Sequence, residues 1–229
     1  INGAELHRAV DPKKDQSYFL FATTPKQLQF LRFPLGDISS KDETRRLAKQ
    51  FSLRVSTKPD SQDICFVPNG SYVDIIKKLR PDSDQPGNIL NLTGNVIGTH
   101  KGVINFTVGQ RRGLGLGGGD PLYVIKIDAA HHTITVGPKE ALITRTINIK
   151  EINWLGSKKF LHAPKKGWAV EVKVRSTKPA IPALVVPLAE TKARVVLSCD
   201  EQGISPGQAC VFYETGSTRV LGGGWITKG

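Results

Sequence analysis

A chain of 229 residues with 39% hydrophobic residues is long enough to bury a core, and none of its apolar runs approaches the roughly 20 residues of a membrane span. Its three cysteines, an odd number, argue against a framework of disulfides, and without a secretory signal the sequence fits the reducing cytoplasm. The net charge of +12 favours a polyanionic partner such as nucleic acid, although a solvated basic surface explains the charge equally well.

Two helix starts mark the first part of the chain. Thr24 precedes a proline and a run with helical spacing, as an N-cap does, and Ser40 with Glu43 three residues later has the pattern of a capping box. Residues 54–57 then predict a short extended segment. Helices followed by an extended run indicate the end of an α/β domain, and we assign residues 1–68 to it.

The pattern changes near residue 70. After a short amphipathic helix at residues 71–79, brief β-type runs separated by turn residues predict a small β-rich domain over residues 69–141. In residues 142–229, six longer runs alternate or stay apolar, with a spacing that suits a closed barrel or a sandwich. The fold expected is therefore mainly β, with an α-helical N-terminal part. The β-type runs lie at residues 88–92, 95–100, 121–128, 132–137, 145–155, 168–177, 182–189, 192–199, 208–214 and 218–226.

Residues 109–121 form a glycine-rich run. A dinucleotide-binding loop must follow a strand and open a helix, whereas this run leads into a strand, which argues against a cofactor site. A better interpretation is a flexible basic loop in which Arg111 and Arg112 contact phosphates while the glycines permit close approach. No Cys or His spacing matches a zinc site, and the adjacent His131 and His132 point apart in a strand, so we expect no metal.

The three cysteines have different surroundings. Cys199 and Cys210 lie in or beside β-type runs, where a free cysteine behaves as a small buried hydrophobic residue. Cys65 ends a polar stretch at the change between two domains, where functional sites often occur. A reactive thiolate needs positive neighbours, however, and Asp60 and Asp63 oppose ionisation. From spacing alone, an inert Cys65 is the better interpretation.

Six motifs follow one another along the chain. They are "DPKKDQSYFL" (residues 11–20), "RFPLGD" (32–37), "DSQDICFVP" (60–68), "GTHKGVINFTVGQRRGLG" (98–115), "ISPGQACVFY" (204–213) and "VLGGGWI" (220–226). In this order they resemble the bacterial tRNA-specific 2-thiouridylase (MnmA/TrmU) family, and the resemblance covers essentially the whole chain. It implies the tail of an α/β adenine-nucleotide hydrolase-like domain, a small central β domain, and a C-terminal β-barrel like domain II of elongation factor Tu.

The family resemblance also implies an activity. Family members thiolate C2 of the wobble uridine, position 34, in the tRNAs for Lys, Glu and Gln. ATP, with Mg²⁺, adenylates the C2 oxygen, and a persulfide on Cys65, loaded by a sulfur-relay donor protein, delivers the sulfur. An earlier cysteine completes the transfer and can form a disulfide with Cys65. The tRNA contacts implied are Lys14, Asp15, Gln16, Arg175, Ser176 and Gln208.

The chain departs from the family pattern in two places. The family's ATP-binding loop and first cysteine are absent, and the chain begins at Ile1 and contains no Met. We therefore expect both features to lie upstream, and this chain alone to be inactive and unable to bind ATP. The family's Arg-Tyr-Arg stretch reads Arg175-Ser176-Thr177, which leaves its aromatic contact with a base or sugar without a counterpart.

Some of these residues also fit purely structural roles. Asp15 suits a helix N-cap, and Gln208 suits a turn after a Pro-Gly pair. Two further hypotheses for the chain as a whole stay open. A non-catalytic RNA-binding module related to translation predicts that Cys65 is buried and inert, which alkylation of the native protein tests. A plain β-barrel interaction protein predicts no salt-dependent RNA binding.

Overall fold

The computed structural model describes residues 3–57 and 84–227, which belong to two compact units. The barrel unit comprises Ile1–Lys58, Arg145–Asp200 and Ser205–Gly229, and the central unit comprises Pro59–Thr144 and Glu201–Ile204. None of the helices in the described ranges is long and apolar enough to cross a membrane.

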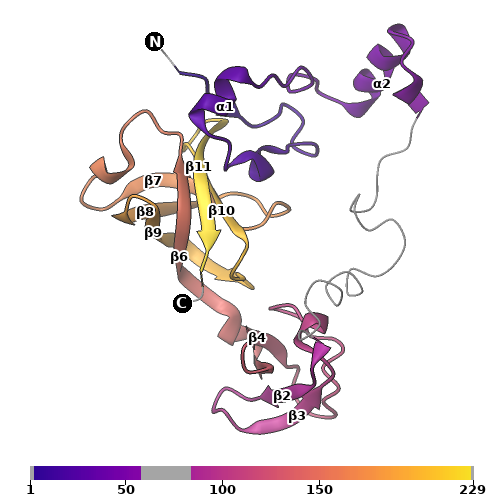
Figure 1. Ribbon diagram of the computed structural model, residues 1–229, viewed down its shortest axis with the longest axis vertical. Helices are drawn as coiled ribbons and strands as arrows, with labels where there is room; N and C mark the ends of the chain where they lie inside the picture. Colours follow the sequence, from indigo (N-terminus) through magenta and orange to yellow (C-terminus); the bar gives the residue numbers. More distant parts are fainter. Residues whose placement is uncertain (1–2, 58–83, 228–229) are drawn as a thin grey trace. The chain divides into compact units, whose positions relative to one another are not determined.

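A closed sheet of six strands forms the barrel unit (Figure 1). The strands are hydrogen-bonded in the order β11-β10-β7-β8-β9-β6, and β11 also pairs with β6, which closes the ring. The six β-type runs predicted after residue 142 are all present, and the barrel is the correct alternative of the two expected. The strands are β6 (Ile143–Trp154), β7 (Trp168–Lys173), β8 (Ile181–Ala189), β9 (Lys192–Gln202), β10 (Ala209–Tyr213) and β11 (Arg219–Ile226).

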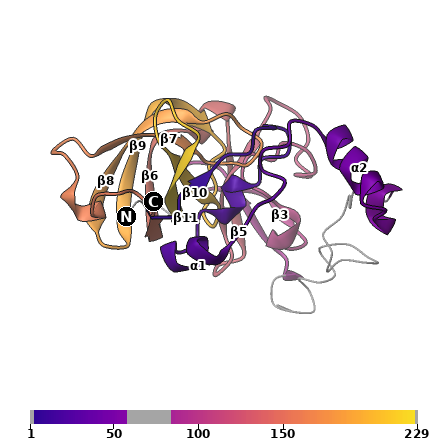
Figure 2. The same ribbon diagram turned by 90° about the horizontal axis from the view of Figure 1, so that it is seen from above.

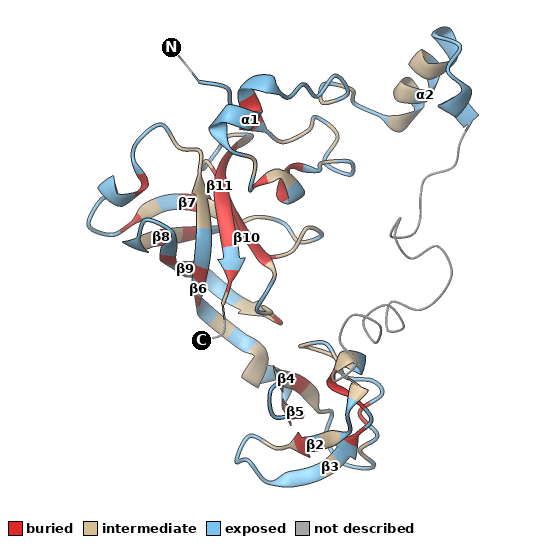
Figure 3. Cartoon of the chain, viewed as in Figure 1, coloured by how far each residue is buried: buried red, intermediate tan, exposed pale blue. Residues whose placement is uncertain are grey.

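Consecutive glycines let β11 approach both of its neighbours. A Cβ at Gly222 would lie 2.0 Å from the backbone oxygen of Asn153, and one at Gly223 would lie 2.5 Å from that of Cys210. Gly222 also has φ +104°, a left-handed conformation that only glycine adopts easily. All five residues of β10 are buried, and Figure 3 shows β10 and β11 as the most continuously buried part of the molecule.

The N-terminal segment packs on the barrel. Strand β1 (Leu6–His7) pairs with β11, opposite Val220 and Arg219. The 3-10 helix η1 (Ser17–Leu20) and α1 (Pro25–Phe30) follow, and α1 lies beside β10 and β11 in both ribbon views (Figures 1 and 2). One hydrophobic cluster joins the two parts. Its members are Leu6, Tyr18, Phe21 and Leu28 from the segment and Ala209, Val211, Tyr213 and Val220 from the barrel.

Polar and aromatic contacts strengthen this attachment. The Asn153 Nδ2 donates hydrogen bonds to the backbone oxygens of Phe21 at 2.7 Å and of Thr23 at 2.9 Å. Phe21 also meets Trp225 edge-on, with ring centroids 5.2 Å apart. Asn153 and Trp225 of the barrel therefore hold residues 21–23, which connect η1 to α1, in place.

Helix caps agree with the sequence in part. Thr24 and Gln27 form a reciprocal capping box at α1. At α2 (Lys41–Gln50) the Ser40 hydroxyl accepts from the Glu43 N–H, but the Glu43 carboxylate contacts the Ser39 hydroxyl instead of completing the box. The extended segment predicted at residues 54–57 is wrong. These residues form a 3-10 helix, η2 (Arg54–Thr57), and no described strand pairs with them.

The central unit contains a four-stranded sheet in the order β3-β2-β5-β4, in which β2 and β5 are parallel. Each strand matches a β-type run in the sequence, whereas the helix predicted at residues 71–79 lies outside the described residues. His131 and His132 lie in the turn before β5 and not in a strand. The strands are β2 (Gly87–Leu90), β3 (Val96–His100), β4 (Tyr123–Asp128) and β5 (Thr133–Gly137), and the core is Ile89, Val103, Leu114, Val124, Ile134 and Val136.

Candidate nucleic-acid interface

The loop before η1 is organised by the carboxylate of Asp15. Its Oδ1 accepts hydrogen bonds from the backbone N–H groups of Ala9 (3.3 Å) and Ser17 (3.0 Å), and its Oδ2 accepts one from the Ser17 hydroxyl (3.0 Å). Asp15 therefore has a local structural role near the start of η1. Lys14 and Gln16, on either side of it, are exposed. The carboxylate thus fixes the backbone between two exposed polar side chains.

Strand pairing brings the second and third sets of expected RNA contacts together. β7 and β10 are antiparallel, with Lys173 opposite Val211. The chain turns just after β7, at residues 174–178, and Gln208 comes directly before β10, so Arg175 and Ser176 lie near the same end of this strand pair as Gln208. Arg175, Ser176 and Gln208 are all half-buried. The three side chains therefore lie at one end of the barrel, although the sequence separates them widely.

Tyr18 joins the Asp15 loop to this end of the barrel. Its hydroxyl donates a hydrogen bond to the backbone oxygen of Ala209 at 2.9 Å, next to Gln208. Burial raises the pKa of Tyr18 to about 12, and Arg175 lies close enough for its charge to oppose part of that rise. Three segments that are distant in the sequence therefore meet in the barrel unit.

The turn before β10 contains polar atoms that lack partners. Gly207 donates its N–H to the Ile226 oxygen, and Ile226 donates to the Gln208 oxygen, both at 2.8 Å. The Oε1 of Gln208 and the hydroxyl of Ser205 are buried and bond to none of the residues the structure describes. Buried polar atoms normally have partners, so these two identify the turn as a functional candidate. Sequence reasoning missed Ser205, although it lies within the motif "ISPGQACVFY".

Further cations lie near the Asp15 loop. Partial desolvation, together with the nearby charges of Arg45 and Lys14, lowers the pKa of Lys41. Arg8, in contrast, serves the interior of the unit, because its guanidinium lies 3.9 Å from the centre of the Tyr213 ring and 3.4 Å from the Glu171 carboxylate. Acids in the first turn of α2 oppose part of this charge, since Asp42 raises the pKa of Lys41 and the Glu43 carboxylate lies 4.0 Å from the Arg46 guanidinium.

Two of the cysteines lie in the barrel unit. Cys210 is buried in β10 as expected, and burial raises the pKa of its thiol to about 12. Cys199 is exposed, so the expectation of a buried packing residue is wrong there. Side chains alternate along a strand, so Cys199 should point inward as Leu197 does. Cys199 is nevertheless exposed, because the pairing of β9 with β8 ends at Leu197, opposite Ala183. Cys65 lies outside the described residues.

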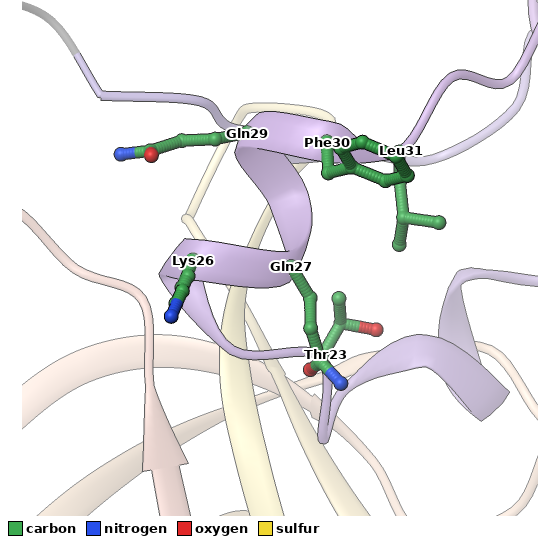
Figure 4. Close-up of a pocket in the computed structure, with 6 residues that line it drawn as sticks. All are labelled: Thr23, Lys26, Gln27, Gln29, Phe30 and Leu31. Atoms are coloured by element: carbon green, nitrogen blue, oxygen red, sulfur yellow. The ribbon is translucent and has the colours of Figure 1, made fainter.

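Arg111 and Arg112 belong to the central unit and are exposed. No group of three or more His, Cys, Asp or Glu side chains that could hold a metal occurs in residues 3–57 and 84–227. A hollow beside α1 is lined by residues that do not converge on one point, since Gln29 and Phe30 extend in opposite directions (Figure 4). We therefore do not assign the hollow as a binding site.

Three family models match the chain in consecutive segments. A tRNA methyl transferase HUP domain matches residues 1–69, and a tRNA methyl transferase PRC-barrel domain matches residues 74–138. An aminomethyltransferase beta-barrel domain matches residues 144–226. Together the three models cover nearly the whole chain, in the order that the sequence led us to expect.

Proteins named tRNA-specific 2-thiouridylase MnmA are similar along the full chain. Those of Ruegeria pomeroyi and Roseobacter denitrificans are 57% identical over 229 and 228 residues, and that of Cereibacter sphaeroides is 58% identical over 228 residues. These matches cover 100%, 99% and 99% of this chain. The chain belongs to the tRNA-specific 2-thiouridylase family. It spans 60% of the length of each of these relatives.

In this member of the 2-thiouridylase family, the compact units of the structure do not coincide with the domains that the family models match. The HUP-domain match continues to residue 69, yet the structure assigns Ile1–Lys58 to the same compact unit as the barrel. The Asp15 loop therefore belongs by sequence to one family domain and by packing to another. A site built from both requires the two domains to fold together.

Proposed function

We propose that this chain is the tRNA-binding and sulfur-carrying part of a tRNA 2-thiouridylase. The observation that carries the proposal is the meeting of the Lys14–Gln16 loop, the end of β7 with Arg175, and the start of β10 with Gln208 in one unit. An exposed lysine, an arginine and amide groups together suit phosphates, sugars and base edges. The names of the relatives supply tRNA as the nucleic acid.

The finer form of the proposal follows the family. Sulfur carried as a persulfide on Cys65 replaces the C2 oxygen of the wobble uridine in the tRNAs for Lys, Glu and Gln, after activation of that oxygen by ATP with Mg²⁺. None of the described residues is assigned to ATP, because the glycine-rich run leads into β4 and does not open a helix that could hold phosphates. A second protein supplies the sulfur.

Salt-dependent tRNA binding tests the RNA part. Arg175→Ala and Lys14→Ala should each lower the slope of log affinity against log salt by about one, because each removes one phosphate contact. Gln208→Ala should weaken binding by up to about tenfold with little change of slope, since an amide carries no charge. Lys192→Ala, at an exposed cation on β9, is the matched control. Salt-independent binding, or none at low salt, would contradict the proposal.

Substitution of Cys65 tests the sulfur part. In the full-length protein, Cys65→Ser should abolish formation of 2-thiouridine while leaving tRNA affinity unchanged, because a hydroxyl cannot carry a second sulfur. Cys199→Ser and Cys210→Ser are the controls and should retain thiolation. Mass spectrometry after loading with a sulfur donor should place the persulfide on the peptide with residue 65. An alkylation-resistant Cys65 with normal tRNA binding would favour a non-catalytic RNA-binding module.

A further inference from the structure

The glycine-rich run of the central unit has fixed points on both sides of its two arginines. The Gly109 N–H donates to the Val124 oxygen at 2.8 Å, and the Val124 N–H donates to the Gln110 oxygen at 2.9 Å, so residues 109–110 pair with β4. On the other side, Leu114 is buried in the core of this unit. Only residues 111–113 connect these two points, and a segment this short has few conformations.

The side chain of Gln110 holds the short segment together. Its Oε1 accepts a hydrogen bond from the Thr107 N–H at 3.0 Å. Its Nε2 donates to the Arg112 oxygen at 2.9 Å and to the Asn105 oxygen at 3.4 Å. One carboxamide therefore braces the backbone on both sides of Arg111. Gly113 follows with φ +77°, which lets the chain turn back toward the core.

The charges of this segment face no described counter-ion. Arg111 and Arg112 are exposed, and neither guanidinium hydrogen-bonds or pairs with another residue within the described ranges. Asp128 of the same unit is already engaged, because it lies 3.1 Å from His131. Two adjacent guanidinium groups repel one another, and an anion that binds both relieves this repulsion. The planar guanidinium fork matches the oxygens of a phosphate.

We propose that Arg111 and Arg112 bind backbone phosphates of the tRNA, and that Gln110 is a positioning residue that holds the two arginines in place. The proposal rests on the proposed function and adds an RNA contact in the central unit. A protein partner is less well suited, because protein interfaces depend on apolar and aromatic side chains at their centre. Here the exposed neighbours at residues 113, 115 and 117–119 are glycines, and Leu114 is buried.

Salt titrations of tRNA affinity, measured by fluorescence anisotropy on the full chain, test the proposal. Arg111→Ala/Arg112→Ala should weaken binding by at least about tenfold and lower the salt slope by about two. Arg111→Lys/Arg112→Lys should keep the slope, since the charges remain, but lose affinity a few-fold because lysine lacks the fork. Gln110→Met, which removes the brace at similar volume, should lower the slope by about one. Lys139→Ala, at an exposed cation of the same unit, should leave it unchanged.

Each outcome supports or overturns a specific part of the proposal. If the double alanine variant keeps the parental slope while Arg175→Ala lowers it, this site is wrong and the proposed function stands. If the parental chain binds no tRNA, the proposed function itself fails. Unchanged tRNA binding with loss of binding to the sulfur-donor protein would make the loop a protein-docking site and would also overturn the proposal. If Gln110→Met keeps both the parental salt slope of tRNA affinity and the parental melting temperature, Gln110 does not position the arginines.

Discussion

The two units hold their candidate RNA contacts on frameworks of opposite kinds. In the barrel unit, Lys14, Arg175 and Gln208 come from three segments that only the closed sheet brings together. In the central unit, Arg111 and Arg112 are neighbours, and the bonds that hold them come from residues 105–124. The site in the barrel unit is therefore lost when any part of that unit unfolds. The site in the central unit depends mainly on one loop and on strand β4.

The largest effect should come from opening the barrel at β11. Gly222→Ala places a Cβ 2.0 Å from the Asn153 oxygen at a left-handed backbone position, so β11 must move away from β6. We expect a loss of about 3 kcal/mol or more in the free energy of unfolding of the barrel unit. Denaturant unfolding followed by tryptophan fluorescence measures this unit selectively, because Trp154, Trp168 and Trp225 all belong to it.

A matched glycine provides the control for this prediction. Gly216 also has a positive φ, +70°, but a Cβ there would meet no atom within 4 Å. Gly216→Ala should therefore cost only about 1 kcal/mol, which is the strain of the left-handed conformation. Pulse proteolysis should show residues 84–144 unaffected by either change. Equal losses for the two variants would mean that closure by β11 contributes little.

A smaller effect should come from releasing the Asp15 loop. Tyr18→Phe removes the hydrogen bond to the Ala209 oxygen and should cost about 1 kcal/mol of stability in the barrel unit. It should also weaken tRNA binding a few-fold, because Lys14 loses its fixed position relative to Arg175. Tyr123→Phe is the control, since this hydroxyl in the central unit bonds to no described residue. Unchanged tRNA affinity in Tyr18→Phe would separate the loop from the binding site.

The two units should also differ in how they respond to pH, because burial shifts the pKa of different groups in each of them. Burial raises the pKa of Tyr18 and of Cys210 to about 12, from 10.0 and 9.0. Their contribution to the stability of the barrel unit is complete below pH 9 and is lost between pH 9 and 12, as pH rises through the folded-state values. Unfolding curves followed by tryptophan fluorescence from about pH 7 to about pH 11 measure this loss.

The central unit should respond to acid instead. Burial lowers the pKa of His100, whose Nδ1 accepts from the Gly102 N–H and whose Nε2 donates to the His132 oxygen, both at 3.1 Å. Stability from the neutral ring is complete above its ordinary value of 6.5 and declines as pH falls below it. Pulse proteolysis of residues 84–144 between about pH 7.5 and about pH 5 should show this decline, and His100→Gln should flatten it. If the stability of both units changed with pH in the same way, the assignment of acid sensitivity to His100 and of alkaline sensitivity to Tyr18 and Cys210 would be wrong.

The sequence predicts local features better than long-range ones. The strands of both units follow from runs of apolar and β-branched residues, and Thr24 follows from cap chemistry, because these signals lie within a few residues. β1 has only two residues and no periodicity, so its pairing with β11 could not be inferred. The exposure of Cys199 depends on where pairing with the start of β8 ends, which the β9 sequence does not contain.

The candidate site shows the same division. Arg111 and Arg112 were chosen from their own loop, whereas Gln110 was missed because its role lies in hydrogen bonds to backbone groups around it. The family resemblance supplied Lys14, Arg175 and Gln208, but not the Tyr18 bond that connects their segments. Side-chain chemistry identifies candidates, and topology decides which of them meet.

The pairing of β1 with β11 has a consequence during synthesis. Leu6 lies opposite Val220, so the segment that carries Lys14 cannot dock until the ribosome has made nearly the whole of this sequence. Contacts between such distant residues form slowly, because a long loop must close first. Until then, the exposed apolar side chains of residues 6–28 have no partner and are available to chaperones. An incomplete nascent chain therefore cannot assemble the end of the barrel where the segments of Lys14, Arg175 and Gln208 meet, so the proposed RNA site forms only after the barrel has been translated.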